Sequence, residues 1–409
     1  MSQKPIKVSA GKRGDKVRSD CFVEIEQKTT GGIKINLISK VNSMYGESIR
    51  AFLEEMCVFF DLKNAEISVE DSGALPFVMA ARFELAVKRL CPELTKEFLL
   101  PINKKNSYKT TKERLRRSRL YLPGNEPKFF MNAGLHEPDA IILDLEDSVA
   151  PSEKDAAQLV VRNALRAVDF YGAERMVRIN QLPKGKEDLK YIIPHNVHVI
   201  LVPKCEEAVQ IIELEDEVMR LKKEYNIKDD IYYMPIIESA KGVINAYNIA
   251  SASENNCALA IGLEDYTADI GTQRTDEGKE SYFARTMLVN AAKAAQIQAI
   301  DTVFSDVNDM EGLRKSVLEA KALGFEGKGC IHPRQIKIIN ESFAPTSEEI
   351  EKAKKIVKAF EEAEKNGIGV VALGSKMIDA PVVKRAQRTI HLAQINKLIK
   401  ENWRETEEK

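Results

Sequence analysis

The sequence lacks the features that would direct it to nucleic acid or into a membrane. The formal net charge of its 409 residues is −1, so no overall field favours a nucleic-acid or membrane partner. No apolar run approaches the length needed to cross a bilayer. The basic residues 1–16 contain no apolar core of a signal peptide. We therefore predict a cytoplasmic protein without nucleic-acid or membrane partners.

Its six cysteines are scattered and include no C-x-x-C pair. This pattern favours reduced thiols in the cytoplasm over a disulfide framework or a zinc site. No G-x-G-x-x-G motif follows a predicted strand, which disfavours an open dinucleotide-binding sheet.

We predict four parts: a small α+β domain over residues 1–92, a linker over 93–116, an α/β barrel over 117–341 and a C-terminal extension or lid over 342–409. In the first part, alternating apolar and polar residues predict strands over 21–26, 32–37 and 65–70. Residues 29–32 predict a hairpin-like turn between the first two of these. Helical periods cover 48–60 and continue in a second helix to about residue 89.

The predicted linker carries a run of basic residues that extends to the start of the barrel: Lys104, Lys105, Lys109, Lys112, Arg114, Arg116 and Arg117. Such a run is typical of a solvated tether. An alternative is a phosphate-facing surface for a nucleotide-bearing thioester carrier.

Strand and helix patterns alternate from residue 118 onward, which predicts parallel strands. Eight strand candidates cover 119–122, 140–145, 175–180, 198–202, 231–237, 258–263, 299–304 and 327–331. Eight such units predict a (β/α)8 TIM barrel of the α/β class. A C-terminal helical extension follows, with a helix over 347–365, an extended segment over 367–373 and a last helix from Asp379 to about residue 403.

Two of the apolar runs end at carboxylates, Glu238 and Asp265. Carboxyl ends of barrel strands form the mouth where ligands bind. Two carboxylates there suit Mg²⁺, which fills its other positions with water and substrate. The alternative is that both residues cap the following helices.

Further polar residues follow other strands, including Arg178 and a cluster of Asp144, Glu146 and Asp147. The cluster either binds metal-bound water or fixes Arg178 and Lys204. Arg178 itself either stabilises substrate charge or forms a salt bridge with the cluster.

Several motifs occur in order along this part of the chain: RSRLYLPG at 117–124, ILDLEDSV at 142–149, VRIN at 177–180, VPK at 202–204, IESAKG at 237–242, IGLED at 261–265, GFEGK at 324–328, IHP at 331–333 and KMIDAP at 376–381. With these motifs, residues 114–392 resemble the citrate lyase beta subunit and its relatives, the malyl-CoA and citramalyl-CoA lyases of the HpcH/HpaI aldolase superfamily.

The resemblance implies a Mg²⁺-dependent oxo-acid lyase that cleaves a 3-hydroxyacyl thioester into a 2-oxo acid and an acetyl thioester. It implies Glu238 and Asp265 as metal ligands and, with Arg178 and Asp379, as catalytic residues. It implies substrate contacts by Tyr121, Lys128, Arg117, Arg178, Glu264, Ile331 and His332. In relatives the residue at Asp379 comes from a neighbouring subunit, so a homo-oligomer (trimer or hexamer) is expected. From the sequence alone, Asp379 is a helix cap.

Residues 8–92 resemble the citrate lyase acyl carrier (gamma) subunit through Ala10-Gly11, Ser19-Asp20 and the segment 69–75. In that family a serine in a Ser-x-Asp setting carries a phosphoribosyl-dephospho-CoA arm. Here Ser19 directly precedes Asp20, and Arg18 occupies the position two before it.

With Ser19 as the attachment site, the expected reaction is cleavage of the citryl carrier to oxaloacetate and the acetyl carrier, served by a separate citrate:acyl-carrier transferase subunit. The alternative is a malyl-CoA or citramalyl-CoA lyase that acts on the free CoA thioester and keeps the first domain as an unmodified assembly module.

Overall fold

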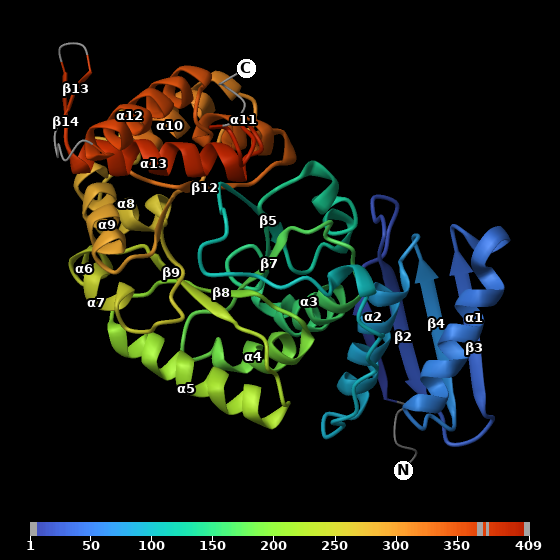
Figure 1. Ribbon diagram of the computed structural model, residues 1–409. Coiled ribbons are helices and arrows are strands. Elements are labelled where there is room, and N and C mark those ends of the chain that lie inside the picture. The colour runs from blue at the N-terminus through green and yellow to red at the C-terminus, as the bar shows by residue number, and fades with distance from the viewer. Residues whose placement is uncertain (1–5, 366–370, 374–375, 405–409) are drawn as a thin grey trace. The chain divides into compact units, whose positions relative to one another are not determined.

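The structure is a computed structural model that describes residues 6–365, 371–373 and 376–404. The chain divides into two compact units, Met1–Ile336 and Lys337–Lys409. The first unit contains a small α+β domain, whose sheet is drawn in blue in Figure 1, and a closed barrel. No helix in the described part of the chain is long and apolar enough to cross a membrane.

The small domain has a four-stranded sheet in the order β1-β2-β4-β3. Its elements are β1 Lys7–Gly11, β2 Cys21–Gln27, β3 Ile33–Ser39, α1 Asn42–Phe59, β4 Ala65–Asp71 and α2 Pro76–Leu90. The predicted hairpin is wrong, because β4 lies between β2 and β3 and pairs with both. Since β3 and β4 are parallel, α1 forms the crossover that joins them.

Burial in this domain follows the two faces of its sheet. Strand β2 alternates buried and partly exposed residues, as a sheet with one covered face requires. Helix α2 differs because all residues from Phe77 to Val87 are buried. It contacts β1 and β2 as well as α3 of the barrel, so it is covered on more than one side.

The prediction of a solvated tether over 93–116 is wrong for several of its residues. Asn106 and Arg116 are buried. The Arg116 guanidinium forms two 2.8 Å hydrogen bonds with the Glu174 carboxylate, at the start of β7. A basic residue with such a partner is held by the barrel and does not extend into solvent.

Eight parallel strands close the predicted barrel, which confirms the TIM-like fold. They are β5 Ser118–Pro123, β6 Ala140–Asp144, β7 Glu174–Arg178, β8 Val199–Val202, β9 Tyr232–Ile237, β10 Ala258–Ile261, β11 Gln298–Asp301 and β12 Gly327–Cys330. Two 3₁₀ turns, Pro127–Phe129 and Ala133–His136, follow β5. The other strands are followed by α3 Lys154–Ala167, α4 Lys186–Ile192, α5 Ala208–Glu224, α6 Ala240–Ile244, α7 Ala246–Ala250, α8 Leu263–Asp269, α9 Tyr282–Ala294, α10 Met310–Leu323 and α11 Pro333–Phe343.

The barrel interior is an apolar core that includes Ile142, Met176, Leu201, Met234 and Ile236. Tyr121 packs against this core from β5. Because the strands are parallel, their carboxyl ends lie together at one end of the barrel.

The second unit contains α12 Ser347–Lys365, β13 Val371–Leu373, β14 Lys376–Ile378 and α13 Ala380–Ile395. Its core includes Ile356, Val383, Ile390 and Trp403. Helix α12 has the predicted bounds. The predicted extended segment corresponds in part to β13, and its residues 367–370 lie outside the described residues. The last helix ends earlier than predicted, and Lys397 beyond it takes a left-handed φ of 57°.

Candidate active site

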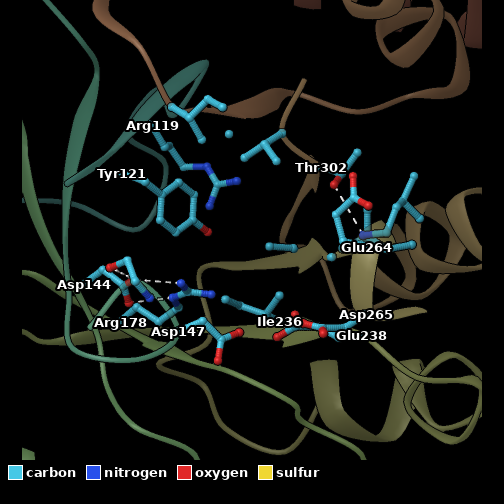
Figure 2. Close-up of a pocket in the computed structure, with 18 of the residues that line it drawn as sticks. Arg119, Tyr121, Asp144, Asp147, Arg178, Ile236, Glu238, Glu264, Asp265 and Thr302 are labelled. Carbon is cyan, nitrogen blue, oxygen red and sulfur yellow. Dashed lines mark hydrogen bonds and ion pairs between the residues drawn. The ribbon is translucent and has the colours of Figure 1, made fainter. Parts of the chain in front are cut away.

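A cavity of about 370 Å³ opens among the carboxyl ends of the barrel strands. Its lining includes the predicted residues Tyr121, Arg178, Glu238, Glu264, Asp265 and Ile331. Figure 2 shows Glu238 and Asp265 close together, with Arg178 and Asp144 paired nearby. The fold therefore brings the two predicted metal ligands and the predicted catalytic arginine to one cavity.

Glu238 directly follows β9 and is only 6% exposed. Its Oε1 atom accepts a 3.0 Å hydrogen bond from the backbone N–H of Lys204, a residue with a left-handed φ of 50°. Burial and the neighbouring Asp265 carboxylate raise the pKa of Glu238 to about 8. Two carboxylates that repel each other in this way attract a cation.

Gly262 leaves room for the Glu238 carboxylate. A Cβ atom at Gly262 would lie 2.6 Å from Oε2 and 2.9 Å from Cγ of Glu238. The φ of Gly262 is −110°, which other residues adopt without strain. The glycine is therefore needed here for space and not for backbone freedom.

Asp265 lies in the first turn of α8, which begins just beyond β10. The structure contradicts the alternative that both carboxylates cap the following helices. Ser239 caps α6 with its hydroxyl, which accepts a 3.1 Å hydrogen bond from the N–H of Gly242. The residue at the N-cap of α8 is Gly262.

The pair of carboxylates fits Mg²⁺ by the chemistry of its donors. Within the described residues, no group of three or more His, Cys, Asp or Glu side chains could hold a metal ion. Magnesium is typically held by one or two carboxylates, with water and substrate in its other positions. Glu238 and Asp265 therefore supply the number and type of ligand expected of a magnesium site that also binds substrate.

Arg178 ends β7 and is held by two acidic residues. Its Nε and Nη2 atoms each donate a 2.7 Å hydrogen bond to Asp144, and Nη1 lies 3.0 Å from Oε2 of Glu146. Burial lowers the pKa of Arg178, but the Asp144 carboxylate more than offsets this, so the pKa is raised overall. Lys204 lies 2.9 Å from Oε1 of Glu146. These contacts confirm that the acidic cluster fixes Arg178 and Lys204.

Tyr121 and Arg119 face the cavity from alternate positions of β5. The Tyr121 ring lies 5.3 Å from the guanidinium carbon of Arg178. Arg119 was not predicted as a site residue, although it is a charged residue two positions from Tyr121 on the same face of a strand. That spacing is the signal that could have identified it. Thr302, just beyond β11, also lines the cavity and was not predicted.

Three residues predicted to contact substrate do not line this cavity. Arg117 precedes β5 at the opposite end of the barrel, where it pairs with Asp139 at 2.8 Å. Lys128 lies 3.0 Å from Glu126 in the turn after β5. The Nδ1 atom of His332 accepts a 3.1 Å hydrogen bond from the N–H of Arg334.

The two remaining predicted residues lie in other elements. Ser19 precedes β2 with a left-handed φ of 56°, and its N–H donates a 2.9 Å hydrogen bond to the carbonyl oxygen of Ser72. The neighbouring Asp20 is buried and pairs with Arg82 at 2.8 Å. Asp379 belongs to the second unit, where its carboxylate caps α13 by accepting a hydrogen bond of 3.2 Å from the N–H of Val382.

The barrel is closed and parallel, and two carboxylates and a fixed arginine lie at its carboxyl end. These features place the protein in the class of metal-dependent TIM-barrel enzymes. Residues 117–333 match the family HpcH/HpaI aldolase/citrate lyase. The chain belongs to this family. Residues 12–90 match a second family, malonate decarboxylase delta subunit (MdcD).

The chain is similar to citrate lyase subunit beta of Leuconostoc mesenteroides subsp. cremoris, at 43% identity over 290 residues, covering 70% of this chain and 96% of that protein. It is 33% identical over 290 residues to mitochondrial citramalyl-CoA lyase of Homo sapiens, covering 68% of this chain and 85% of that protein. Among solved structures, it is similar to protein CitE of Mycobacterium tuberculosis in complex with magnesium, acetoacetate and coenzyme A. That likeness has a TM-score of 0.57 and 28% identity, and it covers 69% of this chain and 99% of the other.

Proposed function

We propose that the protein is a Mg²⁺-dependent carbon–carbon lyase that cleaves a citryl thioester into oxaloacetate and an acetyl thioester. The observation that carries this proposal is the pairing of Glu238 and Asp265 at the cavity, beside the fixed Arg178. The likeness to citrate lyase subunit beta supports the substrate, and the likeness to a structure with magnesium and coenzyme A supports the metal and the thioester.

In this reaction the bond between the carbinol carbon and the α-carbon of the thioester breaks. The hydroxyl proton leaves to a base, and the carbinol oxygen becomes the oxo group of oxaloacetate. The electron pair of the broken bond passes to the thioester as an enolate, which takes up a proton to give the acetyl thioester. Magnesium held by Glu238 and Asp265 would act as a Lewis acid and would orient the 2-hydroxy acid.

Arg178 has donors to spare for the charge that develops on the thioester. A guanidinium has five N–H groups, and the contacts to Asp144 and Glu146 engage three of them. The remaining two can bind a thioester oxygen or a carboxylate. Because Asp144 and Glu146 fix the side chain before substrate binds, little reorganisation accompanies the reaction.

Asp379 is the proposed acid-base residue, supplied by a neighbouring subunit of a homo-oligomer. Support comes from the KMIDAP motif at 376–381, one of the motifs that carry the family resemblance. We expect an Asp379→Asn chain and an Arg178→Ala chain each to be inactive, and mixed oligomers of the two to regain activity. Mixtures as inactive as the separate variants would show that the two residues do not complete one site across subunits.

The first domain is the proposed acyl carrier, with Ser19 bearing the arm and a transferase subunit loading it. The match to an acyl-carrier family over residues 12–90 supports this role. Two observations favour the alternative, an unmodified assembly module with free CoA thioesters as substrates. Ser19 is adjacent to Asp20, and the buried Glu84–Arg162 ion pair ties α2 to α3 of the barrel. Mass spectrometry of the chain from its native host distinguishes the two, because only the carrier has a mass increment on the Ser19 peptide.

The lyase proposal is tested with citryl, citramalyl and malyl thioesters of CoA, assayed with and without Mg²⁺. We expect wild-type protein to release oxaloacetate from the citryl thioester only when Mg²⁺ is present. Glu238→Gln should abolish release, and the exposed control Glu224→Gln on α5 should not change it. Cleavage that is independent of Mg²⁺, or that persists in Glu238→Gln, would refute the proposal.

A further inference from the structure

Arg119 is a buried cation without an anionic partner among the residues that the structure describes. It is 1% exposed in the interior of the barrel. Its Nη1 atom lies 3.0 Å from the sulfur of Met234, and its buried Nε has no hydrogen-bond partner. No carboxylate of the described residues forms an ion pair with it. A thioether sulfur is a weak acceptor, so the charge of Arg119 is not compensated.

The other buried arginines show that this fold normally provides oxygen acceptors for a buried guanidinium group. In the described part of the chain, four of them pair with a carboxylate and one donates to backbone and amide oxygens: Arg82 with Asp20, Arg116 with Glu174, Arg162 with Glu84, Arg285 with Asp301, and Arg175 with Asn196. Burying an unpaired charge lowers the stability of a folded protein by roughly several kcal/mol. Burial also lowers the pKa of Arg119, in keeping with this cost.

The position of Arg119 indicates what offsets this cost. It lines the same cavity as Glu238, Asp265 and Arg178. In Figure 2 its guanidinium points into the open space between Tyr121 and Thr302, across from the two carboxylates. Arg178 lines the cavity as well, but Asp144 and Glu146 already neutralise it. Arg119 is therefore the cavity-lining cation that the described residues leave for a ligand.

We propose that Arg119 binds the second carboxylate of the substrate, the one on the carboxymethyl branch of a citryl thioester, and so determines which thioester is cleaved. The inference rests on the proposed function and deepens it. The metal end of the cavity holds the 2-hydroxy acid, and the guanidinium fork of Arg119 matches a carboxylate with two parallel donors. A citramalyl thioester has a methyl group at this branch and a malyl thioester has hydrogen, so neither provides the anion.

The experiment compares citryl-CoA with citramalyl-CoA, using the full chain with Mg²⁺. We expect Arg119→Met to lower the kcat/KM ratio of citryl to citramalyl by about 100-fold or more, since a site built to bind a polar group discriminates strongly against its absence. Arg119→Lys keeps the charge but loses the fork, and it should lower the ratio less. An unchanged ratio in both variants would overturn the proposal.

The matched control is Arg175→Met, outside the cavity, which replaces another buried arginine that has no carboxylate partner in the described part of the chain. It should leave the ratio unchanged. Thermal unfolding separates a structural role from a functional one. Because Arg119 has no carboxylate partner among the described residues, Arg119→Met should unfold at the wild-type temperature or above it, whereas a structural arginine would lower that temperature when replaced.

Binding of 2-oxo acids gives a readout that does not depend on turnover. Oxaloacetate has the second carboxylate and pyruvate does not. In calorimetric titrations with Mg²⁺, wild-type protein should bind oxaloacetate more tightly than pyruvate, and Arg119→Met should bind the two about equally. A wild-type protein that cleaves no thioester but shows this preference would refute the proposed lyase activity while supporting the role of Arg119. No preference in the wild type would overturn that role.

Discussion

Replacement of Gly262 by alanine tests how closely the fold fits the proposed metal ligand. The new Cβ would lie 2.6 Å from Oε2 of Glu238, well inside contact distance, so the carboxylate must move. The backbone conformation of Gly262 suits alanine, so no backbone strain accompanies the change. A displaced ligand lowers metal affinity by about 10- to 100-fold, which is about 1.4–2.7 kcal/mol.

The assay is titration of thioester cleavage with Mg²⁺, together with Mn²⁺ binding followed by electron paramagnetic resonance. The control variant Gly46→Ala changes a helical glycine of the first domain and should leave both unchanged. In a double-mutant cycle, Gly262→Ala should have no further effect on metal affinity once Glu238 is glutamine, because both changes act through one carboxylate. Wild-type metal affinity in Gly262→Ala would refute the reasoning.

Three further predictions concern the residues that support the site and the fold. Asp144→Asn should lower kcat/KM about 100-fold, since Arg178 loses its charged partner, and normal kinetics would contradict this. Glu84→Ala should lower the free energy of unfolding by about 3–5 kcal/mol in urea titrations, because Arg162 loses its main partner in a site where both are 0% exposed. Burial lowers the pKa of His198 to about 3, so below pH 6.5 only the unfolded chain takes up its proton and stability falls as pH decreases. Between pH 7 and pH 5, His198→Gln should therefore lose less stability than wild type, by about 2 kcal/mol.

The barrel could be predicted because its strands are short apolar runs that end at polar residues. The run before Glu238 shows where β9 ends, whereas β10 ends at Ile261, two residues before the predicted end at 263, and Asp265 lies in the first turn of α8. Both carboxylates still line the cavity, as predicted. Pairing within the small sheet could not be predicted in this way. The segment 29–32 has the composition of a hairpin turn, but β4 pairs with both flanking strands, and this choice depends on residues more than thirty positions away.

The burial of charged residues was the second feature that could not be predicted from the sequence. Arg116 belongs to a basic run that is typical of solvent, and its burial depends on Glu174 in a strand far along the chain. Arg119 lies in the same strand as Tyr121, a cavity-lining residue that was predicted to contact substrate. The residues around such an arginine in the sequence do not indicate whether it forms an ion pair within the protein. The partner belongs to another strand or to the ligand.

The measurement that tests the central claim most directly is a crystal structure of the protein soaked with Mn²⁺, which replaces Mg²⁺ and gives an anomalous signal. We predict one strong anomalous peak in the barrel mouth, about 2.0–2.3 Å from carboxylate oxygens of both Glu238 and Asp265. The same soak of Glu238→Gln should lose the peak. A peak elsewhere, or a wild-type cavity without one at saturating Mn²⁺, would contradict the account.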